Sequence, residues 1–166
     1  MRLNLTIIAE GKNDFVRSLQ QTGYEFNLIG DSSSDSIQKA IEKTSTGGGL
    51  MILADEYPAR RIEVNRDHLD YAQRKNIKIF IEYPAALHGY SFGDPATIVY
   101  ERLIAADGFL SSDECASIGP EKDTIMTANG CYYLPVEADD YHLCLAKAAG
   151  YDKIVYGLPE TVYPIL

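Results

Sequence analysis

The chain has 166 residues, of which 46% are apolar and 23% charged, and this composition is typical of globular proteins rather than of disordered or fibrous ones. The 24 acidic and 15 basic residues give a net charge of −9, which repels nucleic-acid phosphates and anionic membranes. No apolar run approaches the roughly 20 residues that cross a bilayer, so we expect no membrane span. We predict one domain over residues 1–166, without nucleic acid as a partner and without a membrane span.

The first half of the chain alternates β-rich apolar runs with segments of helical periodicity. The predicted strands are Leu3–Ala9, Phe26–Ile29, Leu50–Ala54 and Ile77–Ile81. The predicted helices lie between them, around Phe15–Leu19, around Ile37–Ile41 after N-cap candidates in Asp31–Ser36, and over about Val64–Lys75. Three successive β-α units predict an α/β fold with three layers, a mostly parallel central sheet of at least five strands and helices on both faces.

The alternation of predicted strands and helices ends after Pro84, and the pattern of the second half predicts antiparallel additions near the C-terminus. Strand-like runs are Thr97–Ile104, Thr124–Thr127 and Lys153–Tyr156, separated by loops rich in Gly, Pro, Ser and Asp at Leu87–Pro95 and Leu110–Asp123. His142–Ala149 fits either a helix or a strand paired with Lys153–Tyr156, and we favour the strand. Because the sequence ends just after Pro164 without a helix cap, we expect the native chain to be longer.

Motifs with a defined chemistry are absent from the sequence. Cys115, Cys131 and Cys144 have no C-x-x-C spacing, which leaves buried thiols or one disulfide plus a free thiol. His68, His88 and His142 lie far apart in the sequence with no metal-ligand spacing, so we predict no metal site. No phosphate-binding or dinucleotide-binding glycine motif occurs, and we expect no cofactor.

A short repeat follows two of the predicted strands. Glu56-Tyr57-Pro58-Ala59 and Glu82-Tyr83-Pro84-Ala85 share the same four letters. Because ligands bind outside the carboxyl ends of parallel strands, we expect Glu10, Asp55, Glu56 and Glu82 to share one depression, lined also by Tyr57 or Tyr83. The candidate ligand-binding residues are Glu10, Asp55, Glu56, Tyr57, Arg60, Glu82, Tyr83, His88 and Tyr90.

Carboxylates accept hydrogen bonds from hydroxyl groups, and tyrosine offers apolar area beside a polar tip. This mixture suits a sugar or another polyol. A purely structural interpretation stays open, because X-Pro steps often end strands, the preceding tyrosine then packs, and acids at strand ends cap helices.

One stretch near the N-terminus, Ile8-Ala9-Glu10-Gly11-Lys12-Asn13-Asp14, resembles the opening E-G-K-x-D motif of the Toprim fold of topoisomerases, primases and small ribonucleases. The resemblance implies an acid–base role for Glu10 and a later D-x-D pair that holds Mg²⁺. Here the matching strand ends Asp55-Glu56-Tyr57, so tyrosine replaces the second aspartate. A Toprim-like phosphoryl transfer, or an unrecognised hydrolase using Glu10, Asp55 or Glu82, is the alternative function.

Three distinctive strings carry a second resemblance: Gly49–Pro58, Lys78–Pro84 and Ala148–Pro159. Over nearly its full length the chain is similar to class I glutamine amidotransferase-like, flavodoxin-like domains, and in particular to those at the N-terminus of large bacterial glycosidase-like proteins. In true amidotransferases the turn after the fourth strand carries a nucleophilic cysteine between glycines. Here that turn reads Glu82-Tyr83-Pro84-Ala85-Ala86, and no His-x-Glu follows late in the chain.

The second resemblance therefore implies the fold without the amidotransferase activity. It points to a non-catalytic accessory domain of a carbohydrate-active protein, which binds sugar or packs on a C-terminal catalytic domain of the same chain. The compartment would be the periplasm if that parent is a secreted glycosidase, and the cytoplasm otherwise.

Overall fold

The structure is a computed structural model that describes residues 2–99, 101–105, 125–137, 143–146 and 163–164. The chain divides into two compact units, Met1–Gly89 and Tyr90–Leu166, and each unit is described by itself. The prediction of a single domain stays a prediction.

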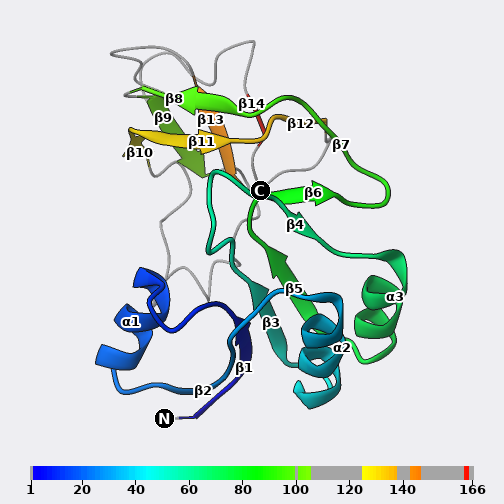
Figure 1. Cartoon of the computed structure of the whole chain (residues 1–166). Helices are drawn as coiled ribbons and strands as arrows, with labels where there is room; N and C mark the ends of the chain where they lie inside the picture. The colour runs from blue at the N-terminus through cyan, green and yellow to red at the C-terminus, as the bar shows by residue number, and fades with distance from the viewer. Residues whose placement is uncertain (1, 100, 106–124, 138–142, 147–162, 165–166) are drawn as a thin grey trace. The chain divides into compact units, whose positions relative to one another are not determined.

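A parallel sheet forms the centre of the N-terminal unit (Figure 1). Its strands are β1 (Arg2–Ile8), β2 (Glu25–Ile29), β3 (Gly49–Ile52) and β5 (Lys78–Ile81), in the order β2-β1-β3-β5. Two short strands, β4 (Ile62–Glu63) and β6 (Pro84–Ala86), pair in parallel beyond it. The predicted α/β class with a parallel sheet is confirmed, and the described residues give this sheet four strands where at least five were expected.

Three helices connect these strands at the predicted places: α1 (Asp14–Gln21), α2 (Ser34–Lys43) and α3 (Arg66–Arg74). Each begins at a residue whose side-chain oxygen accepts hydrogen bonds from backbone N–H groups of the first turn, which would otherwise lack partners. These N-caps are Asn13, Ser33 and Asn65.

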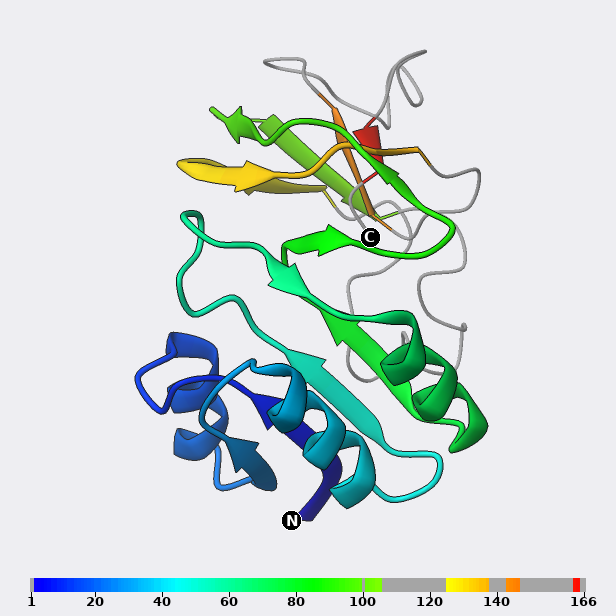
Figure 2. The ribbon, with the colours of Figure 1, turned by 45° about the vertical axis from the view of Figure 1, so that its right-hand side comes forward.

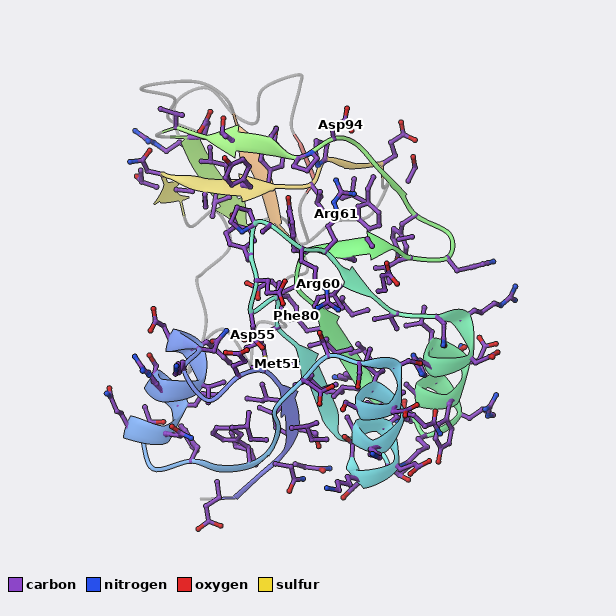
Figure 3. The ribbon with its side chains drawn as sticks, viewed as in Figure 1. Met51, Asp55, Arg60, Arg61, Phe80 and Asp94 are labelled. Atoms are coloured by element: carbon purple, nitrogen blue, oxygen red, sulfur yellow. The ribbon has the colours of Figure 1, made fainter. Side chains whose placement is uncertain are left out.

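The helices cover both faces of the sheet, as the alternation of side chains along β1 shows. Ile7 packs in a core cluster with Val16 of α1, whereas the next side chain, Thr6, accepts a 2.8 Å hydrogen bond from the hydroxyl of Thr44 just after α2. α3 lies on the same face as α2 (Figure 2). Met51 and Phe80 are register partners on β3 and β5 and pack, half-buried, against the α1-side core (Figure 3).

The turn before β3 requires glycine at two positions. Gly47 adopts a positive φ of 74°, which disfavours residues with a Cβ atom. A Cβ on Gly48 would lie 2.7 Å from Asn4 Oδ1 and 2.9 Å from the backbone oxygen of Ser45. The run Gly47-Gly48-Gly49 therefore ends the α2 unit and lets the chain enter the sheet close beside β1.

The C-terminal unit is built from short antiparallel pairs. Its strands are β7 (Ser91–Phe92), β8 (Ala96–Ile98), β9 (Glu101–Ala105), β10 (Ile125–Ala128), β11 (Cys131–Tyr133), β12 (Val136–Glu137), β13 (Leu143–Ala146) and β14 (Tyr163–Pro164). The sheet order is β10-β9-β13-β14, with β8 pairing β11 and β7 pairing β12. A small core of Ile98, Ala128 and Tyr133 lies within this unit.

The predicted antiparallel additions near the C-terminus are thus confirmed. Residues 143–146 form a strand, as favoured, and pair with β9 and β14. The predicted partner Lys153–Tyr156, the loop Leu110–Asp123 and Cys115 lie outside the described residues. Cys131 is a free, half-buried thiol.

Candidate functional site

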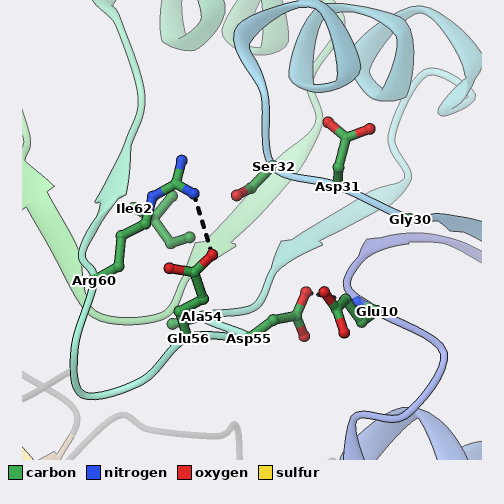
Figure 4. A pocket seen from close by; sticks show the side chains of 9 residues that line it. All are labelled: Glu10, Gly30, Asp31, Ser32, Ala54, Asp55, Glu56, Arg60 and Ile62. Carbon is green, nitrogen blue, oxygen red and sulfur yellow. Dashed lines mark hydrogen bonds and ion pairs between the residues drawn. The ribbon is translucent and has the colours of Figure 1, made fainter.

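A depression lies at the carboxyl edge of the parallel sheet in the N-terminal unit (Figure 4). Its lining comes from the loops after β1, β2 and β3 and from the first residue of β4, and consists of Glu10, Gly30, Asp31, Ser32, Ala54, Asp55, Glu56, Arg60 and Ile62. The chain leaves β1 toward β2 on one side and leaves β3 toward β5 on the other. The depression therefore lies where the strand order reverses, which is the usual ligand position in open α/β sheets.

The free volume of this depression is about 90 Å³. One water molecule needs about 10 to 15 Å³ of such space, so the depression holds about six to nine waters. A single small polar molecule, such as one sugar ring, is the size of ligand that it can accept without rearrangement.

Asp55 joins the ends of β3 and β1. Its Oδ2 accepts a 2.6 Å hydrogen bond from the backbone N–H of Glu10, and its Oδ1 lies 3.3 Å from the donating Nδ2 of Asn13. The Oδ1 of the same Asn13 caps α1 by accepting from the N–H groups of Phe15 and Val16. Asp55 therefore fixes the loop that carries Glu10 as well as lining the depression.

Glu56 and Arg60, four residues apart in the turn after β3, form an ion pair with 3.5 Å between Oε1 and Nη1 (Figure 4). Both side chains are more than half exposed, and exposed pairs of this kind contribute little to stability. The Arg60 guanidinium is the one cationic group among the nine lining residues, against four carboxylates. A ligand that donates hydrogen bonds fits this balance better than an anion does.

Asp31 is a lining residue that the sequence analysis named only as a helix-cap candidate. Hydrogen bonds from the Ser33 and Ser36 side chains and from the Ser33 backbone lower the pKa of this exposed carboxyl to about 2. The Ser33 N–H lies 2.9 Å from Asp31 Oδ1. Asp31 thus stays charged across the neutral and mildly acidic range. Its position two residues after the end of β2 was the signal that could have identified it.

Glu82 does not line the depression but supports its wall. Its half-buried side chain follows β5, and its Oε2 accepts a 2.8 Å hydrogen bond from the backbone N–H of Ala54. Ala54 itself lines the depression. Glu82 is thus not among the lining residues, because its carboxylate is turned to the neighbouring strand, and its role in ligand binding stays a prediction.

The two predicted tyrosines contact each other outside the depression. Their ring centroids are 5.1 Å apart at an interplanar angle of 80°, an edge-to-face arrangement. Tyr83 is buried and adopts a positive φ of 50°, and Arg61 lies 5.8 Å from its ring centroid. Tyr57 is 37% exposed. Neither tyrosine is among the residues that line the depression, and their role in ligand binding stays a prediction.

The two remaining predicted residues are His88 and Tyr90. His88 is exposed, with its Nε2 3.4 Å from Nη1 of Arg66, and Tyr90 belongs to the C-terminal unit. Of the nine predicted site residues, the structure brings together Glu10, Asp55, Glu56 and Arg60.

The described residues contain no group of three or more His, Cys, Asp or Glu side chains that could hold a metal ion. Within the same ranges, no helix is both long and apolar enough to cross a membrane. No protein-family model matches the chain, and neither a curated protein nor a solved structure matches it.

Proposed function

We propose that the chain is a non-catalytic accessory domain of a carbohydrate-active protein and that it binds a sugar or related polyol in the carboxyl-edge depression. The observation that carries this proposal is the gathering of Glu10, Asp55 and Glu56, with Arg60, in one open depression where the strand order reverses. Gatherings of polar side chains at this place in an α/β sheet are the ones to which ligands bind.

The chemistry of the lining supports a neutral polyhydroxyl ligand. Carboxylates accept from sugar hydroxyl groups, the Arg60 guanidinium donates to hydroxyl oxygens, and the Ser32 hydroxyl can do either. The buried Ile62 adds an apolar surface for the carbon-bound hydrogens of a ring. Because several hydrogen-bond acceptors line the depression, the arrangement of hydroxyl groups on the ligand would determine the orientation in which it binds.

The strand order β2-β1-β3-β5 is compatible with the resemblance to flavodoxin-like, amidotransferase-like domains. The turn after β5, where those enzymes carry their nucleophile, has the left-handed backbone of a strained elbow at Tyr83. That residue is a buried tyrosine rather than an accessible thiol. This supports a domain that keeps the fold and lacks glutaminase activity, and ammonia release from glutamine would contradict it.

Chemical-shift mapping tests the binding. The full-length ¹⁵N-labelled chain is titrated with glucose, galactose, mannose, xylose and their disaccharides, with trimethylamine N-oxide, which has no hydroxyl group, as the control for nonspecific effects. We expect a binding sugar to shift the amides of residues 10, 30–32, 54–56 and 60. If no sugar shifts them, the depression is better explained as a surface that packs on a catalytic domain of the same chain.

A matched pair of variants separates the site from general charge effects. Glu10→Gln removes a lining carboxylate, whereas Glu63→Gln removes an exposed carboxylate on β4 that does not line the depression. Loss of one charged hydrogen bond costs about 1.5 to 3 kcal/mol, so we expect affinity to fall by about tenfold or more in Glu10→Gln. Affinity in Glu63→Gln should equal that of the wild type.

One observation favours the Toprim-like alternative: the Asp55 carboxylate contacts the Glu10 backbone. Both Asp55 oxygens already accept protein hydrogen bonds, however, and Tyr57 stands where a second aspartate would be needed. A Mg²⁺-dependent nuclease or primase assay decides. Activity that disappears in Glu10→Gln would place phosphoryl transfer ahead of sugar binding.

A further inference from the structure

His68 is a buried histidine between α2 and α3 that the proposed site does not use. It lies in the first turn of α3 and is only 5% exposed. Its Nε2 is 3.5 Å from the hydroxyl oxygen of Ser34, the first residue of α2. Its Nδ1 is buried without a hydrogen-bond partner among the described residues. One of its ring nitrogens thus makes a long contact and the other makes none.

The surroundings of His68 disfavour a positive charge. The ring lies by the first turns of two helices, where the helix dipoles are positive. Burial lowers the pKa of His68 below its usual 6.5, and the neighbouring Asp67 carboxylate opposes this only in part. The charged residues of the elements packed against α3, namely Asp35, Lys39, Glu42 and Lys43 of α2 and Lys78 of β5, are all exposed.

The other ends of the same two helices are held firmly. The Lys75 ammonium, just after α3, donates to three backbone oxygens at the end of α2, those of Ile41 at 2.6 Å, Glu42 at 2.9 Å and Thr44 at 2.7 Å. A cation at this place also complements the negative end of the α2 dipole. The helix pair therefore has three hydrogen bonds from Lys75 at its C-terminal end, and at its N-terminal end a long contact made by a titratable side chain.

We propose that protonation of His68 in mildly acidic solution separates the first turn of α2 from α3, while Lys75 keeps the C-terminal ends together. A buried imidazolium needs acceptors for two N–H groups, and in this packing it has at most the Ser34 hydroxyl. The separation would move the loop before α2, in which Asp31 and Ser32 form one wall of the depression. The helix movement stands alone, whereas its effect on binding rests on the proposed function.

NMR of the full-length chain between about pH 8 and about pH 5 tests the device. We expect the His68 ring to titrate below 6.5. The amides of residues 30–37 should shift with the same midpoint, and those of Lys75 to Ile77 should not. In His68→Gln, which keeps a neutral donor and acceptor near Ser34, the shared shifts should disappear. In His88→Gln, which removes an exposed histidine, they should persist.

Shifts of residues 30–37 that persist in His68→Gln would overturn the proposal, as would a His68 ring that titrates without moving them. If His68→Gln does not fold, Ser34→Ala decides. Removing the one acceptor of the protonated ring should lower the His68 midpoint further, and an unchanged midpoint would overturn the proposal. If a sugar that binds is found, its affinity is measured at neutral and at acidic pH. Weaker binding at acidic pH in the wild type but not in His68→Gln would show that the helix movement also controls binding in the depression. Helix movement without any sugar binding would overturn only the proposed function.

Discussion

The loop after β3 and the loop after β5 contain the same letters, Glu-Tyr-Pro-Ala, in different environments. Glu56, Tyr57 and Pro58 are all exposed, and Glu56 lines the depression. After β5, Tyr83 and Pro84 are buried, and the preceding glutamate is half-buried against the backbone of Ala54. Identical letters therefore form a solvent-exposed surface at one strand end and part of the structural core at the other.

The cause of this difference is register. Ile52 of β3 and Ile81 of β5 are partners in the sheet and are the last residues of their strands. Glu82 follows Ile81 directly and so remains level with the neighbouring backbone, whereas Glu56 comes four residues after Ile52, beyond the sheet edge. A glutamate close to the edge satisfies a backbone N–H that the ladder leaves open, and one further out reaches solvent or a ligand.

The largest difference should appear on removing the tyrosine rings. Tyr83→Ala deletes a buried ring, and such deletions cost about 3 to 5 kcal/mol because they leave a cavity. Tyr57→Ala deletes a ring that is 37% exposed, and we expect a loss of about 1 kcal/mol. Urea unfolding followed by circular dichroism measures both. Equal losses in the two variants would show that burial does not distinguish the two strand ends.

The two glutamates should differ less strongly but in the same direction. Glu82→Ala leaves the buried N–H of Ala54 without its acceptor, which costs about 1 to 3 kcal/mol. Glu56→Ala removes only an exposed ion pair with Arg60, worth about 0 to 1 kcal/mol. Urea unfolding measures the loss of stability in both variants. Sugar affinity should fall in Glu56→Ala and stay unchanged in Glu82→Ala. A Glu82→Ala variant as stable as the wild type would refute its structural role.

The contact between the two strand ends can be measured separately. The edge-to-face pair of Tyr57 and Tyr83 should contribute about 0.5 to 1.5 kcal/mol beyond the burial of each ring. A double-mutant cycle with Tyr57→Leu and Tyr83→Leu isolates this term, since leucine keeps apolar volume while removing the ring. Additive losses would mean that the two strand ends are energetically independent.

The sheet could be predicted from the sequence because its signal is local. Continuous apolar runs such as Leu50–Ala54 and well-placed caps such as Ser33 specify strands and helices from neighbouring residues alone. The carboxyl-edge position of Glu10, Asp55 and Glu56 followed from the topology. The burial of Glu82 and Tyr83 could not be predicted, because it depends on the register between β3 and β5, which no single strand encodes.

Asp31 and Asn13 were missed for a related reason. Both belong to short polar loops in which capping residues and ligand-binding residues have the same composition. Asn13 caps α1 while its amide group donates to Asp55, and Asp31 accepts from serines while lining the depression. The sequence analysis named Asp31 only within a stretch of cap candidates and named no cap for α1, and the second role of each residue requires a partner or a neighbouring loop that is distant in the chain.

The end of β2 extends the comparison to a third strand and gives the smallest expected effect. The pKa of Asp31 is lowered from 3.8 to about 2 by hydrogen bonds that form only in the folded chain. A folded pKa below the unfolded one means that the carboxylate stabilises the fold above about pH 4, and that this contribution is lost as the pH falls toward about 2. Asp31→Asn should therefore make the free energy of unfolding fall less between about pH 5 and about pH 2 than it does in the wild type. Asp35→Asn, which replaces an exposed aspartate of α2 that does not line the depression, is the matched control. Unfolding in urea at a series of pH values measures the difference. If the stability of the two variants depends on pH in the same way, the serine hydrogen bonds do not lower the pKa of Asp31, and they do not keep this lining carboxyl ionised.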